Sequence, residues 1–135
     1  MTDAQLIRAA ADAACHAYCP YSNFPVGAAL LTCDGHVFTG VNVENASYGL
    51  TVCAERNAIA AAVAAGALEF DTIAIAAGGG TDPVTPCGAC RQVLAEFGPP
   101  DLRIVTASLH PLEATGVYTL NTLLPEAFDA NSLTR

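Results

Sequence analysis

The amino-acid sequence predicts a single α/β domain in which helices cover a mixed β-sheet. Two apolar runs separated by a turn signal indicate an antiparallel hairpin, and the chain after them alternates between helical and strand patterns, which is typical of α/β architecture. The 135 residues suffice for one domain, residues 1–135, and are too few for two, while 53% hydrophobic residues are enough for a core.

The first predicted element is a helix over Thr2–Tyr18. Thr2 and Gln5 have the spacing of a capping box, in which each side chain accepts a hydrogen bond from the backbone N–H of the other residue. Apolar residues recur at helical spacing from Leu6 onward. Pro20 ends the pattern because proline has no backbone N–H to donate.

The hairpin comes next. Val26–Cys33 and His36–Val43 are predicted strands, and Asp34-Gly35 between them is a tight-turn signal that pairs them antiparallel. A loop over Asn45–Thr51 leads to the second half of the chain.

Helices and strands alternate in this second half. Predicted helices cover Cys53–Ala65, which Gly66 stops, and the segment from Pro86 or Cys87 up to Gly98-Pro99-Pro100. The other predicted elements are strands over Asp71–Ala77, Leu102–Ala107 and Val117–Leu120, and a last short helix or turn over Asn121–Phe128.

The helix that begins near Cys53 has no polar face over Ala58–Ala65. A helix that is apolar all round is expected to be buried all round. Only 13% of the residues are charged, which is low for a monomer whose whole surface is wetted. We therefore expect this helix to lie in an interface between subunits. A central position within a monomer is the alternative.

The charge balance argues against a nucleic-acid partner. Thirteen acidic residues against five basic ones give a net charge of −8, and such a surface repels phosphate backbones. No apolar run reaches transmembrane length, and Met1-Thr2-Asp3 does not begin a signal peptide. We expect a cytoplasmic protein that acts on a small molecule and does not associate with membranes.

Three cysteines predict a zinc site. Cys87 and Cys90 follow Pro86, which suits the first turn of a helix, and residues three apart on a helix share one face. Cys53 stands at the start of the preceding helix, and a βαβ-like connection brings successive helix N-termini to the same edge of a sheet. Helix N-termini favour thiolate over thiol. Three protein ligands leave a fourth position for water, as in catalytic zinc sites.

The two residues after this first ligand fit the same chemistry. Glu55 stands two positions after Cys53, so it points away from the ligand face and stays near the metal, where a carboxylate can take a proton from the activated water. Arg56 is three positions after Cys53, on the same helical face. Its guanidinium can donate a hydrogen bond to a thiolate and withdraw charge from a site with three thiolates.

The cysteine spacing leaves other sites open. The three ligands could join a further cysteine in a closed structural four-cysteine site. A thioredoxin-like dithiol is disfavoured because Pro86 precedes the pair and because Cys53 would be unexplained. We interpret the remaining cysteines as small buried residues and the histidines as residues outside the site: Cys15, Cys19, Cys33, His16, His36 and His110.

Several stretches carry a family resemblance. Cys-Ala-Glu followed by Pro-Cys-x-x-Cys resembles the zinc nucleoside deaminases. Over nearly its whole length, the chain resembles the small homotetrameric cytidine deaminases with three cysteine ligands. Its most specific segments are Tyr21–Leu30, Gly40–Ala58, Pro86–Leu94 and Leu123–Phe128. The resemblance implies a three-layer α/β/α sandwich around a five-stranded mixed sheet.

The resemblance also implies substrate-binding roles. Phe24 would pack against the pyrimidine or its sugar, Asn42 and Glu44 would hydrogen-bond the ribose 3′-hydroxyl, and the backbone of Ala54 would meet the amide edge of the base. Neighbouring subunits would close each site with Ala46, Tyr48 and Phe128. From the residue types alone, Phe24 could instead belong to the core, Asn42 and Glu44 could be polar residues at a hairpin end, and Tyr48 could cap a loop.

We therefore expect a zinc-dependent deaminase that converts cytidine and 2′-deoxycytidine to the uridines with release of ammonia, in pyrimidine salvage. One alternative is a deaminase of a cytosine-containing antibiotic such as blasticidin S. Another is a non-catalytic zinc-binding module, which Glu55 argues against because a structural site does not need a free carboxylate beside the metal. A nucleotide or polynucleotide deaminase would need more basic residues to bind phosphate.

Overall fold

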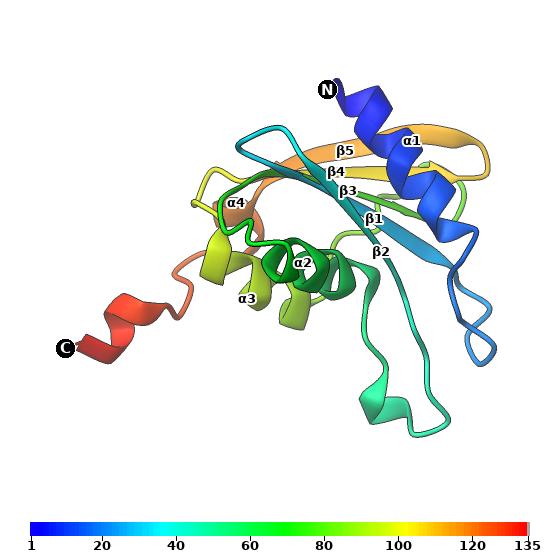
Figure 1. Ribbon diagram of the computed structural model, residues 1–135. Coiled ribbons are helices and arrows are strands. Elements are labelled where there is room, and N and C mark those ends of the chain that lie inside the picture. Colours follow the sequence, from blue (N-terminus) through cyan, green and yellow to red (C-terminus); the bar gives the residue numbers. More distant parts are fainter. Residues whose placement is uncertain (135) are drawn as a thin grey trace.

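A five-stranded mixed sheet lies between two layers of helices in the computed structural model, which describes residues 1–134 (Figure 1). The strand order is β2-β1-β3-β4-β5, and within the described residues β3 and β4 form the one parallel pair. The fold class predicted from the sequence is confirmed. The strands are β1 Val26–Thr32, β2 Val37–Val41, β3 Phe70–Ala77, β4 Arg103–Leu109 and β5 Leu112–Thr119.

The helices divide between the two faces of the sheet (Figure 1). Helix α1, Asp3–Ala14, packs on small strand residues such as Ala29 and Ala74, while the neighbouring Leu30 and Ile73 face the other way. This alternation is the period of two expected of a strand with both faces buried. The opposite face carries α2 (Ala54–Ala64), α3 (Gly88–Phe97) and the short α4 (Leu120–Leu123).

Gly40 allows α2 to approach β2 closely. A Cβ atom at this position would lie 2.4 Å from both the carbonyl oxygen of Ala54 and the backbone nitrogen of Ala58. Because no side chain intervenes, the first turn of α2 lies directly on the sheet. This contact positions the residues at the start of α2, including Glu55.

Three predicted element boundaries were wrong. Helix α1 ends at Ala14 rather than Tyr18, because the backbone of Tyr18 pairs with the segment that follows β2, donating to Asn42 and accepting from Glu44. Strand β5 begins at Leu112, five residues before the predicted strand, and pairs with β4 along its length. Its mixture of exposed and half-buried residues gives no continuous apolar run to reveal it.

The predicted last element, Asn121–Phe128, is also different in the structure. Helix α4 begins at Leu120 and ends at Leu123, and a separate 3₁₀ helix covers Ala130–Thr134. Asp129, which follows Phe128, accepts hydrogen bonds from the backbone of Asn131 and Ser132. That carboxylate therefore caps the 3₁₀ helix. We call residues 124–134 the C-terminal arm.

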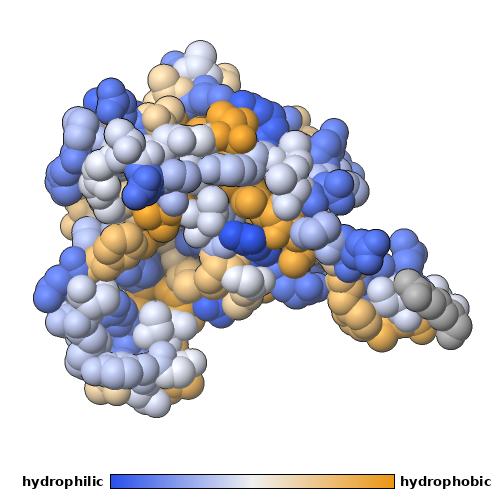
Figure 2. Space-filling view, turned by 180° about the vertical axis from the view of Figure 1, so that it is seen from behind, coloured by the Kyte–Doolittle hydropathy of each residue, from blue (hydrophilic) through white to orange (hydrophobic). Residues whose placement is uncertain are grey.

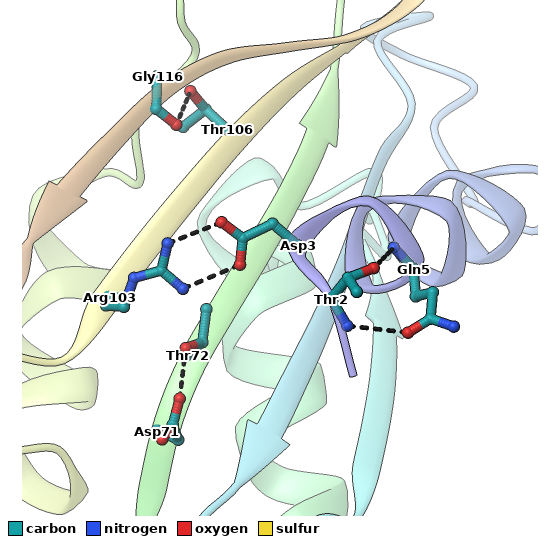
Figure 3. A network of polar contacts seen from close by, with 8 residues as sticks. All are labelled: Thr2, Asp3, Gln5, Asp71, Thr72, Arg103, Thr106 and Gly116. Carbon is teal, nitrogen blue, oxygen red and sulfur yellow. Dashed lines mark hydrogen bonds and ion pairs between the residues drawn. The ribbon is translucent and has the colours of Figure 1, made fainter.

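The N-terminus of α1 is fixed to the sheet by polar contacts (Figure 3). The predicted capping box is present, since the Thr2 hydroxyl accepts from the Gln5 backbone and the Gln5 side chain accepts from the Thr2 backbone. Arg103 of β4 donates two parallel hydrogen bonds, of 2.8 and 2.7 Å, to the carboxylate of Asp3. These bonds hold the pKa of Asp3 below its ordinary value.

We expect Arg103→Met to lower the free energy of unfolding by about 0.2–1 kcal/mol at pH 7, the usual contribution of a partly exposed pair. Because the pKa of Asp3 is lower in the folded chain, this contribution is present above the unfolded pKa of about 3.9 and is lost as the pH falls through the folded pKa. Urea unfolding of both proteins across this pH range measures the difference. If the difference in unfolding free energy between wild type and Arg103→Met persisted undiminished in acid, the Asp3–Arg103 pair would not be its cause.

Candidate active site

The N-termini of α2 and α3 bring three thiols together. Cys53 is the N-cap residue of α2, Cys87 is the N-cap residue of α3, and Cys90 lies in the first turn of α3. The Sγ atom of Cys87 is 3.9 Å from that of Cys53 and 3.5 Å from that of Cys90. The convergence predicted from the helix starts is therefore present, although 34 residues separate Cys53 from Cys87.

The three sulfur atoms fit a tetrahedral zinc ion. They all lie within 4.8 Å of one another. Zinc–sulfur bonds of 2.3 Å at tetrahedral angles place sulfur atoms about 3.8 Å apart. This separation lies between the observed distances of 3.5 Å for Cys87–Cys90 and 3.9 Å for Cys53–Cys87. The donor set is the soft thiolate type that zinc accepts.

The other cysteines take no part in this cluster within the described residues. The expectation that they are all buried was wrong, because Cys15 and Cys33 are exposed and Cys19 is half-buried. Cys15 stands at the C-terminal cap of α1 and Cys33 stands in the turn after β1, positions where an element ends and the chain meets solvent. The closed four-cysteine site therefore has no support from the geometry.

Glu55 lies deep beside the cluster. It is 5% exposed and lines the same pocket as Cys53 and Cys87. Burial raises the pKa of its carboxyl group, since a low-dielectric environment disfavours the charged form. The structure thus brings together the acid/base candidate and the metal-ligating candidates.

Arg56 makes the contact expected of it. One terminal nitrogen of its guanidinium lies 3.4 Å from the Cys53 sulfur. Hydrogen bonds to the thiols of Cys53 and Cys90 raise the pKa of Arg56, so the side chain keeps its positive charge beside the site. A fixed cation here offsets the negative charge of three thiolates.

A pocket of about 250 Å³ opens over the cluster. Phe24, Asn42, Glu44 and Ala54, the substrate-binding candidates expected within one chain, all line it. Its wall also includes residues that the sequence analysis missed, since nothing in their local pattern distinguishes them from other loop and strand residues. These are Ser22, Val26, Thr51, Ile75, Val84 and Thr85.

Two polar residues fix the chain around Phe24. The Asn42 amide donates to the carbonyl oxygen of Phe24 and accepts from the backbone of Val26, both at 2.9 Å. The Glu44 carboxylate accepts from the backbone of Tyr21 and from the backbone and hydroxyl of Ser22. The Ser22 hydroxyl bond is the main reason why the pKa of Glu44 is lowered. Glu44 is therefore an anion at the pocket wall.

The candidates expected to act between subunits lie outside this pocket. Ala46 and Tyr48 belong to the loop after β2, where the ring of Tyr48 meets that of Tyr21 edge-on at 5.7 Å. Phe128 lies on the C-terminal arm. Neither Ala46, Tyr48 nor Phe128 contributes to the wall formed over the cysteines by residues 1–134.

Comparison with known proteins identifies the family. A family model described as the cytidine and deoxycytidylate deaminase zinc-binding region matches residues 1–106. The chain belongs to this family. The α/β fold, the hydrolytic deaminase activity and the zinc cofactor expected from the sequence are thereby confirmed.

Several relatives of this deaminase match along nearly their whole length. The cytidine deaminase of Halalkalibacterium halodurans is 49% identical over 95% of both chains. The crystal structure of cytidine deaminase from Burkholderia pseudomallei is 51% identical, covers 95% of this chain and 100% of its own, and superposes with a TM-score of 0.88. That from Mycobacterium tuberculosis is 43% identical, covers 95% of this chain and 98% of its own, and has a TM-score of 0.80.

A more distant relative bears on the alternative substrate. The blasticidin-S deaminase of Bacillus cereus is 37% identical over 55% of this chain and 58% of its own. This match is partial, whereas the cytidine deaminase of Halalkalibacterium halodurans matches over 95% of both chains.

Proposed function

We propose that this deaminase acts on the free nucleosides cytidine and 2′-deoxycytidine, in cytoplasmic pyrimidine salvage. The observation that carries the proposal is the buried carboxylate of Glu55 beside three convergent thiols, in a pocket that also presents Phe24 and Glu44. An aromatic ring offers a flat apolar wall for a base, and a carboxylate accepts hydrogen bonds from sugar hydroxyls.

Each polar group of the site has a defined task in the proposed reaction. Cys53, Cys87 and Cys90 hold the zinc ion, which when bound supplies Lewis-acid activation of water near neutral pH. Glu55 accepts one proton from the attacking water and delivers it to N3 of the base; it then takes the second proton, from the hydroxyl group now on C4, and passes it to the departing amino group. A carbon–oxygen bond forms at C4, the bond from C4 to the amino nitrogen breaks, and ammonia and the uracil nucleoside leave.

Asn42 and Glu44 hold the Phe24 segment and still have unused hydrogen-bonding positions for the sugar. The Asn42 amide has two N–H donors, of which Phe24 takes one. The Glu44 carboxylate has about four acceptor positions, and three are used by Tyr21 and Ser22. One donor and one acceptor therefore remain for a ribose hydroxyl.

A substrate comparison tests this assignment. We expect turnover of cytidine and 2′-deoxycytidine and much slower turnover of cytidine 5′-monophosphate and blasticidin S. No arginine lines the pocket among the described residues, and the net charge of −8 repels a phosphate. Ultraviolet absorbance with product analysis distinguishes the four substrates. Preferred turnover of blasticidin S or of the monophosphate would contradict the proposal.

We also propose that the active protein is a homotetramer with shared active sites. Figure 1 shows two segments that leave the body of the chain: the loop after β2, which ends in a 3₁₀ helix over Tyr48–Leu50, and the C-terminal arm. Tyr48 is 72% exposed, Phe128 60% and Leu133 75%. Figure 2 shows apolar surface on the C-terminal projection and on the body between the two projections. Neighbouring chains would bury these side chains.

The exposed face of α2 supports the same proposal. Ala61 is exposed within one chain, which argues against a central position of α2 in a monomer and fits the expected position in a subunit interface. Ala62, in contrast, is fully buried in the core of its own chain. The exposed residues of α2 are alanines and Val63, and such small side chains let a second helix approach closely. We expect this face to pack against another copy of the chain.

We expect Ala61→Glu to dissociate the tetramer and to abolish deaminase activity together. A carboxylate placed in an apolar interface is left buried without a partner. Ala4→Glu is the matched control, because it adds the same charge at an exposed position of α1. Sedimentation velocity combined with the cytidine assay measures both properties. A wild-type chain that is fully active as a monomer would contradict the shared sites.

A further inference from the structure

Arg91 links three separate parts of the chain. It lies on α3, directly after the buried Cys90. Its Nε donates to the carbonyl oxygen of Pro86 at 2.7 Å, one terminal nitrogen donates to the carbonyl oxygen of Leu123 at 2.8 Å, and the other donates to the hydroxyl of Thr85 at 2.9 Å. A guanidinium group is a rigid planar fork, so the three acceptors are fixed relative to one another.

Two of these acceptors lie in the segment that carries a metal ligand. Thr85 lines the pocket, and Pro86 directly precedes Cys87. Because Pro86 stands before the N-cap residue of α3, the helix supplies no donor for its carbonyl group. The backbone of Arg91 also donates to the carbonyl oxygen of Cys87 at 3.0 Å. Arg91 therefore holds this segment through both its side chain and its backbone.

The third acceptor lies at the root of the C-terminal arm. Leu123 is the last residue of α4, and the chain leaves the body after it. The neighbouring side chain on α3, that of Gln92, donates to the carbonyl oxygen of Phe128 at 2.8 Å. Arg91 holds the arm at its root and Gln92 holds it further along.

We propose that Arg91 is a positioning residue that fixes the Cys87 side of the metal site and also sets the path of the C-terminal arm. The first role concerns one chain alone. The functional consequence of the second role rests on the proposed sharing of active sites, in which the arm carries Phe128 to a neighbouring subunit.

Two measurements on the zinc-loaded full-length protein test the proposal without any substrate. The first is the rate of zinc release to a colorimetric chelator. The second is amide hydrogen exchange of residues 124–134. Neither depends on deamination, so a failure of the proposed substrate assignment leaves both tests intact. The variants are Arg91→Ala, Arg91→Lys and Thr85→Val, and the controls are Gln92→Ala and Arg103→Ala.

We expect Arg91→Ala and Arg91→Lys to release zinc roughly 10–100-fold faster than wild type, because removing a group that orients a ligand usually lowers metal affinity by about this factor. A lysine ammonium cannot reproduce the three-way fork. Thr85→Val removes one of the three acceptors and should accelerate release less. Hydrogen exchange of the arm should rise in both Arg91 variants and in Gln92→Ala.

The controls separate positioning from general destabilisation. Gln92→Ala touches only the arm and should leave zinc release unchanged. Arg103→Ala also removes an arginine side chain, but one that binds Asp3 on the other face of the sheet. It should change neither zinc release nor hydrogen exchange of the arm. Zinc release at the wild-type rate in all of the Arg91 and Thr85 variants that fold would overturn the proposal. Equal acceleration by Arg103→Ala would overturn it as well.

Discussion

Glu55→Gln is expected to lower cytidine turnover by at least ~10²–10⁴-fold, the usual contribution of a general acid/base group. Glutamine keeps the size of the side chain and one carbonyl oxygen, but it cannot accept and return a proton at neutral pH. Glu55 is 5% exposed and lines the pocket that contains Cys53 and Cys87, so bulk water cannot easily replace its carboxyl group as a proton carrier.

The readouts are the steady-state rate with cytidine and the zinc content of the same preparation. Zinc content and the circular dichroism spectrum should match those of wild type, because Glu55 is not a ligand in the proposed site. Glu69→Gln is the matched control, since it makes the same chemical change at an exposed position and should leave turnover unaltered. Turnover above about a tenth of the wild-type rate in Glu55→Gln would exclude the proton-transfer role.

Loss of a metal ligand should have an effect at least as large. Cys87→Ala leaves two thiolates for the ion, and we expect the zinc content to fall from about one ion per chain to a small fraction, with activity lost in parallel. Cys87 is exposed, so its replacement by alanine opens no cavity in the core and the fold should persist.

Cysteine variants outside the cluster provide the control for this result. Cys15→Ala, Cys19→Ala and Cys33→Ala should each retain the full zinc content and activity. Metal analysis by atomic emission, together with a thermal unfolding curve for each variant, separates loss of zinc from loss of fold. Loss of zinc from any of these three variants would restore the closed four-cysteine site as an explanation.

The sequence was most informative where chemistry and local geometry coincide. Pro86, the helix-ending Gly66 and Gly98 and the recurring apolar residues predict the two helices that begin near Cys53 and Cys87. The structure brings the sulfur atoms of Cys53, Cys87 and Cys90 together. Glu55 and Arg56 could be placed near the metal by helical spacing alone. The hairpin of β1 and β2 followed from its Asp34-Gly35 turn.

The missed features depend on contacts between segments far apart in the chain. Asn42 holds the Phe24 segment across 18 residues, and Arg91 reaches Leu123 across 32 residues. No local periodicity or turn motif in the sequence predicts such long-range hydrogen bonds. The sequence also does not tell which alanines of α2 face the core of their own chain, because alanine is compatible with a core, with an interface and with solvent, so composition alone cannot separate Ala61 from Ala62.

The central claim, zinc-dependent deamination of a free nucleoside, is tested most directly by the ultraviolet loss of cytidine in three preparations of the purified protein: as isolated, after removal of zinc by a chelator, and after zinc is restored. We predict conversion to uridine and ammonia by the first, loss of the activity in the second and its recovery in the third. Undiminished conversion by the zinc-free protein, or no conversion by the zinc-loaded protein, would contradict the account.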